Sequence, residues 1–231
     1  MIRQTLIAIF VCTMIISCEK ESDNMLSQNT IETSGLIDTT IISTDTLEYS
    51  FGYFGDEEGI SIISYPQNSE SCDLLNKQWE ERILQYIPMK DFLGVDSMTI
   101  VKMRGSDGAS PSTDIDTILI VIKVVKNDFH RKLIGKWNWI SSCGGFTGGF
   151  WYPSDDNYEE IEFDYNMNFT EKQNDSIVHV YNYDFIDSFV NGQDTIYEIG
   201  VENGYDTYYR FIGDKLNIQG GDFWKEYVRI E

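Results

Sequence analysis

Apart from its acids, this chain holds few residues that could carry out catalysis or bind a metal. Its 231 residues include two histidines, four cysteines and 38 aspartates and glutamates. Neither His130 nor His179 lies in a recognisable motif, and no G-x-S-x-G nucleophile elbow occurs. No histidines or cysteines have the spacing of a zinc site. Paired carboxylates such as a glycosidase uses cannot be picked out among so many acids. We therefore expect a protein that is not an enzyme and has no metal and no cofactor.

Aromatic side chains are the better candidates for ligand contact. A glycine-rich loop, Cys143–Pro153, ends in three aromatics that could cover the mouth of a barrel, and more aromatics follow in the next part of the chain. Such rings can stack on sugars or line an apolar site. In a β domain they also form core and cross-strand pairs, and the loop could be purely structural. The candidate ligand residues are Phe150, Trp151, Tyr152, Tyr181 and Tyr183.

The charge balance excludes one large class of partner. Seventeen lysines and arginines against 38 acids give a net charge of -21. Nucleic-acid binding needs clustered cations to displace counterions, so we expect no nucleic-acid partner. Docking on anionic lipid by charge alone is disfavoured too. The local acids Asp56-Glu57-Glu58 and Asp114/Asp116 lack the ligand spacing of a calcium loop, and calcium binding stays undecided.

The first residues of the chain are typical of an export signal. Arg3 precedes an apolar run, Leu6–Ile16, that is too short to span a bilayer. The alternative is a short uncleaved anchor. The ending Ile15-Ile16-Ser17-Cys18 resembles the lipobox of bacterial lipoproteins, in which signal peptidase II cleaves before the cysteine and that cysteine carries the lipid. The resemblance implies a signal peptide over residues 1–17 and a membrane anchor on Cys18.

The residues after Cys18 predict a flexible tether over 18–45. They contain no aromatics and many Ser, Thr and Asn. Glu19-Lys20-Glu21-Ser22-Asp23-Asn24 resembles the acidic export signals of lipoproteins of the Bacteroidetes type. That resemblance implies an outer-membrane lipoprotein. Whether it lies on the cell surface or on the periplasmic face stays open, because a solvated tether would look the same.

The rest of the chain predicts an all-β protein, because short apolar runs alternate with Gly, Asn and Asp. Residues 46–127 offer five strands: Thr46–Phe54, Gly59–Tyr65, Arg82–Ile87, Ser97–Met103 and Ile115–Val125. The segments Tyr86-Ile87-Pro88, Phe92–Asp96 and Ser106-Asp107-Gly108, followed by a Val/Ile strand, resemble the immunoglobulin-like and cadherin-like repeats of bacterial surface proteins. The resemblance implies a β-sandwich.

Residues 128–231 predict a small eight-stranded up-and-down barrel, which leaves no exposed edge. Turn signals such as Asn191-Gly192 and Gly213-Asp214 separate the expected strands. These strands are Leu133–Ser142, Tyr158–Tyr165, Met167–Gln173, Ile177–Phe185, Thr195–Val201, Thr207–Ile212, Lys215–Gln219 and Trp224–Ile230.

Both ends of this domain resemble lipocalins, whose opening strand carries G-x-W. Here Gly135 and Trp137 give that motif, and Arg229 lies in the final strand. The resemblance implies that Gly135 bends the chain, Trp137 plugs the barrel and Arg229 stacks on the indole. The stretch is short and no helix follows its last strand. Such a barrel either fills itself with side chains or holds one small ligand. We expect Cys72 and Cys143 to be free.

The expected function is that of a non-enzymatic cell-envelope lipoprotein. Its lipocalin-like barrel would bind a small apolar or glycan ligand, or a partner protein. The alternative is a structural or adhesin-like accessory surface lipoprotein with no small-molecule ligand. A void inside the barrel would favour the first, and a contiguous exposed aromatic patch the second.

Overall fold

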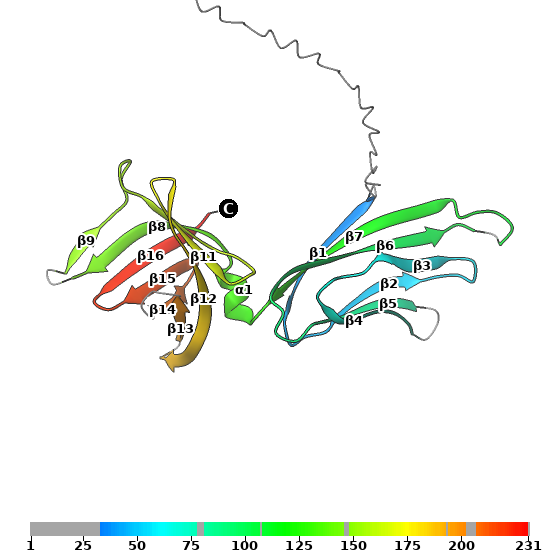
Figure 1. Ribbon diagram of the computed structural model, residues 1–231, viewed down its shortest axis with the longest axis horizontal. Helices are drawn as coiled ribbons and strands as arrows, with labels where there is room; N and C mark the ends of the chain where they lie inside the picture. The colour runs from blue at the N-terminus through cyan, green and yellow to red at the C-terminus, as the bar shows by residue number, and fades with distance from the viewer. Residues whose placement is uncertain are drawn as a thin grey trace, which may run out of the picture. The chain divides into compact units, whose positions relative to one another are not determined.

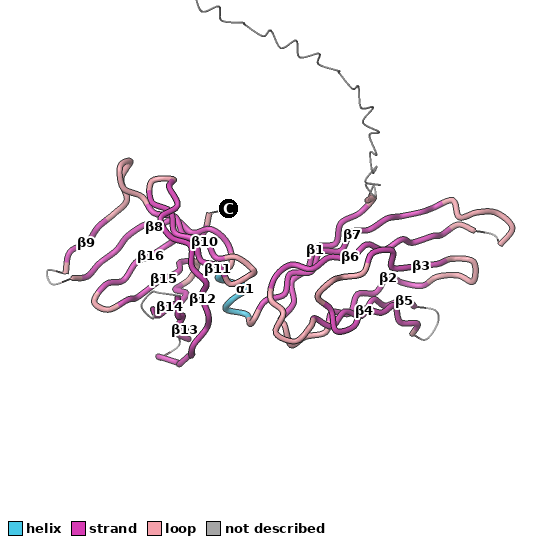
Figure 2. Tube along the Cα trace, viewed as in Figure 1, coloured by secondary structure: helices cyan, strands magenta, loops and turns pink. Residues whose placement is uncertain are grey.

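The computed structural model describes residues 33–77, 81–106, 108–145, 148–192, 194–201 and 207–230. The expected signal peptide, Cys18 and the first part of the expected tether lie outside these ranges. Sixteen strands and one short helix make up the regular structure of the described residues. Figure 1 labels these elements and Figure 2 colours the strands magenta and the helix cyan. The expected all-β class is confirmed.

The first seven strands form two sheets. One sheet has the order β1-β7-β6-β3 and the other the order β2-β5-β4. A single buried cluster draws side chains from both, among them Ile100 and Ile122 from the first sheet and Leu84 and Tyr86 from the second. The two sheets therefore pack face to face. The strands are β1 (Gly35–Ile42), β2 (Leu47–Tyr53), β3 (Gly59–Ser64), β4 (Ser69–Asn76), β5 (Glu81–Pro88), β6 (Gly94–Arg104) and β7 (Asp114–Val125).

Two of these strands, β1 and β4, are absent from the sequence prediction. The expected tether over 18–45 is wrong across Gly35–Ile42, which forms β1 and pairs in parallel with β7. Ile37 and Ile41 pack on the buried cluster, whereas Leu36 is 65% exposed. A half-buried edge strand rich in Thr has the composition of a linker, and only its pairing with β7 distinguishes the two.

A buried aspartate joins several loops of this first part. Asp96 is 5% exposed and accepts a hydrogen bond from the Tyr86 hydroxyl at 3.2 Å. The backbone amides of Gln67 and Asn68 donate to the same carboxylate at 3.0 and 2.9 Å. A buried carboxylate is tolerated only with such partners. The Tyr and Asp of the repeat-like motif thus meet in one hydrogen-bonded group.

The remaining strands form a closed eight-stranded antiparallel barrel. Each strand from β10 to β16 pairs with the next, and both β16 and β10 pair with β8, which completes the ring. A short strand, β9 (Gly149–Trp151), pairs with the far end of β8. The barrel strands are β8 (Gly135–Gly144), β10 (Glu159–Phe163), β11 (Asn168–Gln173), β12 (Ser176–Asn191), β13 (Asp194–Val201), β14 (Thr207–Ile212), β15 (Lys215–Gly220) and β16 (Phe223–Arg229). The expected eight-stranded barrel is confirmed.

A helix that the sequence prediction missed closes one end of the barrel. Helix α1 (Asp128–Leu133) begins after Asn127, whose side chain accepts a hydrogen bond from the His130 amide at 2.7 Å. Phe129 and Leu133 are buried in the barrel core. The Phe129 ring stacks on Tyr197 with 3.8 Å between centroids. The helix therefore acts as an apolar plug.

Gly135, Trp137 and Arg229 meet at this closed end. The Arg229 guanidinium lies 4.4 Å from the centre of the Trp137 ring and donates to the carbonyls of Lys132 and Ile134. Trp137 is 1% exposed, and its indole nitrogen donates to the Leu133 carbonyl at 2.8 Å. Gly135 has a φ of 125°, and a Cβ there would lie 2.5 Å from the guanidinium. The end carrying α1 is thus filled.

Candidate binding site

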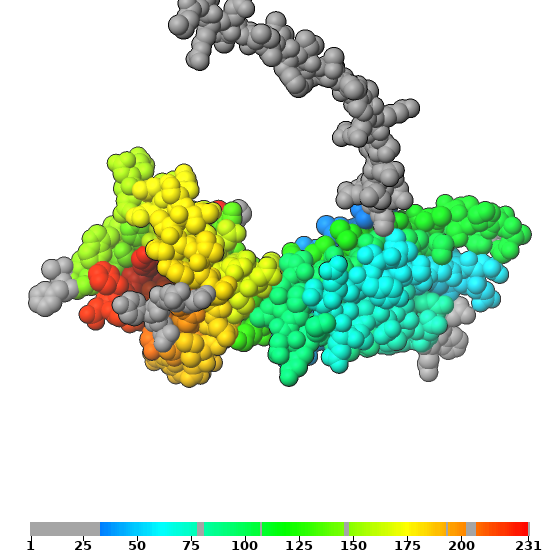
Figure 3. All heavy atoms as spheres, viewed as in Figure 1, coloured from blue at the N-terminus to red at the C-terminus, as the bar shows by residue number. Residues whose placement is uncertain are grey.

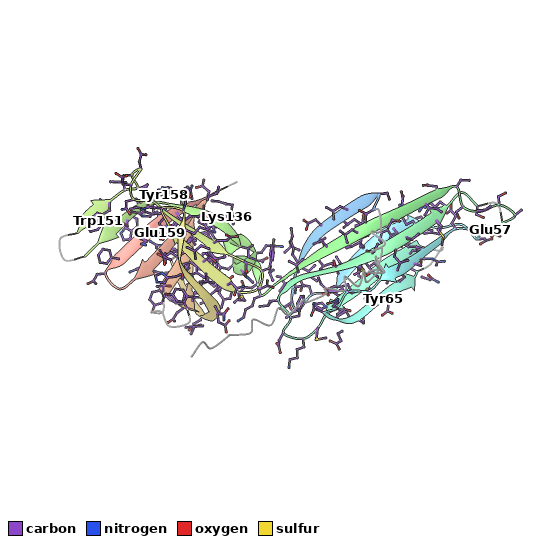
Figure 4. The ribbon with its side chains drawn as sticks, turned by 45° about the horizontal axis from the view of Figure 1, so that its top comes forward. Glu57, Tyr65, Lys136, Trp151, Tyr158 and Glu159 are labelled. Carbon is purple, nitrogen blue, oxygen red and sulfur yellow. The ribbon has the colours of Figure 1, made fainter. Side chains whose placement is uncertain are left out.

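The other end of the barrel holds a cavity of about 280 Å³. Phe163, at the end of β10, pairs with Gly135 beside α1, so Glu159 at the start of β10 lies toward the opposite end. Figure 4 labels Glu159, and Trp151 on the neighbouring β9. The cavity walls are apolar at Phe169, Val201, Ile218 and Phe223, and polar at Glu159, Glu171, Thr207, Tyr209, Lys225 and Tyr227.

Glu159 is the centre of an ionic group inside the barrel. Its carboxylate lies 2.5 Å from the Lys225 ammonium and accepts a hydrogen bond from the Tyr227 hydroxyl. The Glu159 side chain is only 15% exposed. Because side chains alternate along β16, Phe223, Lys225 and Tyr227 all face inward. A charge removed from water is stable only when paired, which this arrangement achieves.

The two cavity tyrosines stay protonated. Burial, together with the negative charge and hydrogen bond of Glu159, raises the pKa of Tyr227 well above its ordinary value. Burial raises the pKa of Tyr209 to about 12, with the Thr207 hydroxyl opposing the shift. Both phenols therefore act as neutral hydrogen-bonding groups at physiological pH rather than as bases.

Glu171 places a second carboxylate in the cavity wall. Its Oε2 atom lies 3.1 Å from Nδ1 of His179. The Glu171 side chain is 27% exposed and that of His179 is 51% exposed, so this pair lies closer to solvent than Glu159. Two carboxylates and one ammonium thus line the cavity. An additional donor or cation would find an acceptor there.

The structure places the five predicted ligand residues outside this cavity lining. Tyr183 is 3% exposed in the barrel core, and Tyr181 is half-buried and stacks on His179. Phe150, Trp151 and Tyr152 are exposed on and after β9. Two of them border it: the Trp151 ring lies 5.8 Å from that of Phe223 in the cavity wall, and Tyr181 lies opposite the wall residue Phe169 in the strand register.

Sequence reasoning missed the residues that do line the cavity. The signal for Lys225 lies in the final strand, where a lysine occupies the alternate position between two aromatics, Phe223 and Tyr227. A lysine at an inward position is favoured by a nearby acid, although the Lys225 side chain itself is 40% exposed. Identifying that acid as Glu159 requires the closed barrel, because the two residues lie 66 positions apart.

The described residues hold neither a metal-binding cluster nor a membrane-spanning helix. Within the described ranges, no group of three or more His, Cys, Asp or Glu is positioned to hold a metal ion. Near the acidic run, Glu58 accepts a hydrogen bond from the Gly55 amide, and Asp116 pairs with Lys102. No helix in the described part of the chain is long and apolar enough to cross a membrane.

Comparison with known proteins does not assign this chain to a family. No protein-family model and no curated protein matches the chain. Among solved structures, the crystal structure of a cysteine protease inhibitor from Entamoeba histolytica matches with 14% sequence identity and a TM-score of 0.26. The match covers 40% of this chain and 88% of that chain. At this score the likeness supports no statement about function.

Proposed function

We propose that this protein is a cell-envelope lipoprotein whose barrel binds a small amphipathic molecule without transforming it. The observation that carries the proposal is the cavity of about 280 Å³, with apolar walls and an inward ionic group, at the end of the barrel opposite α1. The closed barrel and the stacked Trp137–Arg229 pair support a lipocalin-like domain. The two face-packed sheets support an immunoglobulin-like sandwich that acts as a spacer.

The cavity chemistry defines the ligand class. Its volume lies close to the lower end of the range for small-molecule sites, about 300–1,000 Å³. Phe169, Val201 and Ile218 would contact an apolar body. Lys225 is neutralised by Glu159, which leaves Glu171 as the carboxylate nearer to solvent. The ligand that fits best has a compact apolar body and an amine.

Three indole compounds test this proposal because they share a body and differ in charge. We expect tryptamine to raise the melting temperature most, indole less and indole-3-acetate least. Glu171→Gln should remove the preference for tryptamine while indole binding persists. Ile218→Trp should abolish binding of all three by filling the cavity. Its matched control is Gln219→Trp, which adds the same ring on the opposite face of β15.

Two results would contradict the cavity as the site. One is unchanged tryptamine affinity in a folded Ile218→Trp variant. The other is no thermal shift with any of the three indoles at millimolar concentration.

The lipid anchor is tested separately. Cells expressing the full chain should incorporate radiolabelled palmitate into the protein, and Cys18→Ser should abolish incorporation. Protease treatment of intact cells then distinguishes the two faces of the outer membrane, because only a surface-exposed lipoprotein would be degraded. Labelling that persists in Cys18→Ser would disprove the assignment of the anchor.

Exposed aromatics favour a second candidate, an accessory surface protein that contacts other envelope proteins. Phe150, Trp151, Tyr152 and Phe223 are 60%, 43%, 66% and 48% exposed. A photoreactive residue at position 150 should then crosslink to a specific envelope protein in cells. The absence of such a crosslink, together with tryptamine binding, would decide for the small-ligand function.

A further inference from the structure

The outer face of the barrel carries a second concavity, which we call the outer groove. It has a volume of about 360 Å³ and lies over β14, β15 and β16, whose surface atoms are orange to red in Figure 3. Tyr208, Gln219 and Trp224 line it, whereas their neighbours Tyr209, Ile218 and Lys225 line the inner cavity. The outer groove and the cavity thus occupy opposite faces of the same strands.

Two aromatic side chains flank the outer groove. Tyr208 and Trp224 both lie opposite Gln219 in the strand register, so the three side chains form one row across β14, β15 and β16. Adjacent strands are about 4.8 Å apart, which separates the two aromatic positions by about 10 Å. Tyr208 packs edge-on against Phe189 at 5.9 Å, and Trp224 against Phe150 at 6.3 Å. These contacts hold both rings in place.

The next row of the groove is polar. Asn217 lies between Arg210 and Glu226 in the register and is 7% exposed. Its Nδ2 has no hydrogen-bond partner among the described residues. Arg210 forms no ion pair with any acid of the described ranges, whereas Glu226 contacts Lys215 and Ser141 at 3.4 and 3.2 Å. The row therefore places the hydrogen-bond donors of Arg210 and Asn217 beside an acceptor, the Glu226 carboxylate.

An unpartnered buried donor destabilises the free protein, and a ligand that supplies an acceptor removes that penalty. Hydroxyl groups both donate and accept, so a row of Arg, Asn and Glu suits a ligand with several hydroxyls. Flat aromatic faces suit the apolar side of a sugar ring. The net charge of -21 repels polyanions, which argues against an acidic glycan.

We propose that the outer groove binds a neutral oligosaccharide. Sugar rings pack on Trp224 and Tyr208, and their hydroxyls contact Arg210, Asn217 and Glu226. The site is independent of the inner cavity and of the function proposed for it, because the two sets of side chains point to opposite faces.

Affinity electrophoresis of the full mature chain tests the proposal. The gels contain neutral polysaccharides (galactomannan, arabinogalactan, mixed-linkage β-glucan or dextran) or the acidic polygalacturonate. We expect retardation by at least one neutral polysaccharide and none by polygalacturonate. Trp224→Ala should weaken that retardation at least tenfold, and Tyr208→Ala severalfold. Tyr152→Ala is the control for loss of an exposed ring outside the groove and should leave it unchanged.

Asn217→Leu separates binding from a structural role. It removes the unpartnered donor and keeps a side chain of similar size, so the melting temperature should stay the same or rise while retardation weakens severalfold. The cavity variant Ile218→Trp should retain full retardation, which keeps the two proposals distinguishable. The inference is overturned if no neutral polysaccharide retards the protein, if only polygalacturonate does, or if folded Trp224→Ala and Asn217→Leu bind as well as the original chain.

Discussion

At the scale of single residues, His130 shows how burial controls charge in this protein. The side chain is fully buried in α1, and its Nδ1 atom accepts a hydrogen bond from the Lys126 amide at 3.0 Å. Burial lowers the pKa of His130 to about 4, with the Asp164 carbonyl opposing the shift and the Lys126 charge adding to it. The imidazole is therefore neutral in the folded protein at physiological pH.

His130 should make stability depend on pH. The unfolded chain binds a proton near the ordinary pKa of 6.5, whereas the folded protein does so only near 4. The contribution of neutral His130 to the free energy of unfolding is thus fully present above pH 6.5. It is lost as the pH falls toward 4. The loss amounts to about 3 kcal/mol. Urea unfolding at pH 7, 6 and 5 follows the first part of this loss, about 2 kcal/mol by pH 5, with His130→Gln as the variant that lacks this titration. If the difference in free energy of unfolding between the original chain and His130→Gln does not change with pH, the prediction is wrong.

Arg229 should stabilise the closed end through its planar guanidinium. Arg229→Ala removes the stacking on Trp137 and two hydrogen bonds to carbonyls around the end of α1. We expect a loss of about 2 kcal/mol in the free energy of unfolding. Arg229→Lys should recover only part of it, because an ammonium cannot stack in the same way.

The control for Arg229 is Arg131→Ala. Among the described residues, Arg131 forms its ion pair with Asp128 on the exposed side of α1. Such pairs contribute little, so the change should be below about 0.5 kcal/mol. Denaturant unfolding compares the variants. Equal losses in Arg229→Ala and Arg131→Ala would show that Arg229 contributes only its charge.

At the scale of elements, the amino-acid composition of β1 indicates a linker, whereas its backbone pairing makes it a strand. The segment reads as a linker, yet it forms eight residue pairs with β7 from Gly35↔Ile118 to Ile42↔Val125. In a strand whose side chains alternate between core and solvent, the same substitution should affect stability very differently at neighbouring positions. Ile37 packs on the core and Leu36 is exposed, which supplies a matched pair.

Ile37→Asp should lower the free energy of unfolding by about 2–3 kcal/mol, because it places a charge against the apolar cluster. Leu36→Asp, the same substitution one position earlier, should stay within about 0.5 kcal/mol. Denaturant unfolding of both variants checks the prediction. Similar small effects in the two would mean that residues 35–42 behave as the tether that their composition indicates.

The strands β14 to β16 give the opposite case, in which one element has two uses. Their inward side chains line the inner cavity, and their outward side chains line the outer groove. Because the side-chain period of a strand is two, a substitution at one position leaves the next position's face untouched. The paired variants Ile218→Trp and Gln219→Trp rely on this property.

At the scale of the whole molecule, each of the two β parts has its own hydrophobic core and one free cysteine. Cys72 is buried in the first part, where burial raises the pKa of its thiol to about 11. Cys143 lies half-buried at the end of β8. Thiolate, not thiol, is the reactive form, so the two should differ strongly in reactivity.

Iodoacetamide should therefore alkylate Cys143 in the native protein and Cys72 only after unfolding. Peptide mapping by mass spectrometry identifies the modified residue. A reducing agent should leave the melting temperature unchanged, since no bond joins the two cysteines. Rapid native alkylation of Cys72 would show that the core of the first part opens readily.

The sequence by itself determined the all-β class, the eight barrel strands and the residues that meet at the closed end. Alternation and turn residues are local, so runs such as Thr207–Ile212 could be located without any tertiary information. The sequences of β1 and β4 do not alternate clearly between apolar and polar residues, and helix α1 has only six residues. These three elements lack such a local pattern and were missed.

Only the tertiary structure decided where the candidate sites lie. Glu159 meets Lys225 and Tyr227 across 66 and 68 positions because β10 and β16 flank the same strand, β8. Alternation tells which side chains share a face of one strand, but not which strand will lie beside it. Nor does it tell which barrel end a helix will fill, and that choice left the cavity at the end opposite α1. Closure of the ring fixes the strand neighbours, and closure is a property of all eight strands together. The end that α1 fills is the one where β8 begins, because the helix leads directly into that strand.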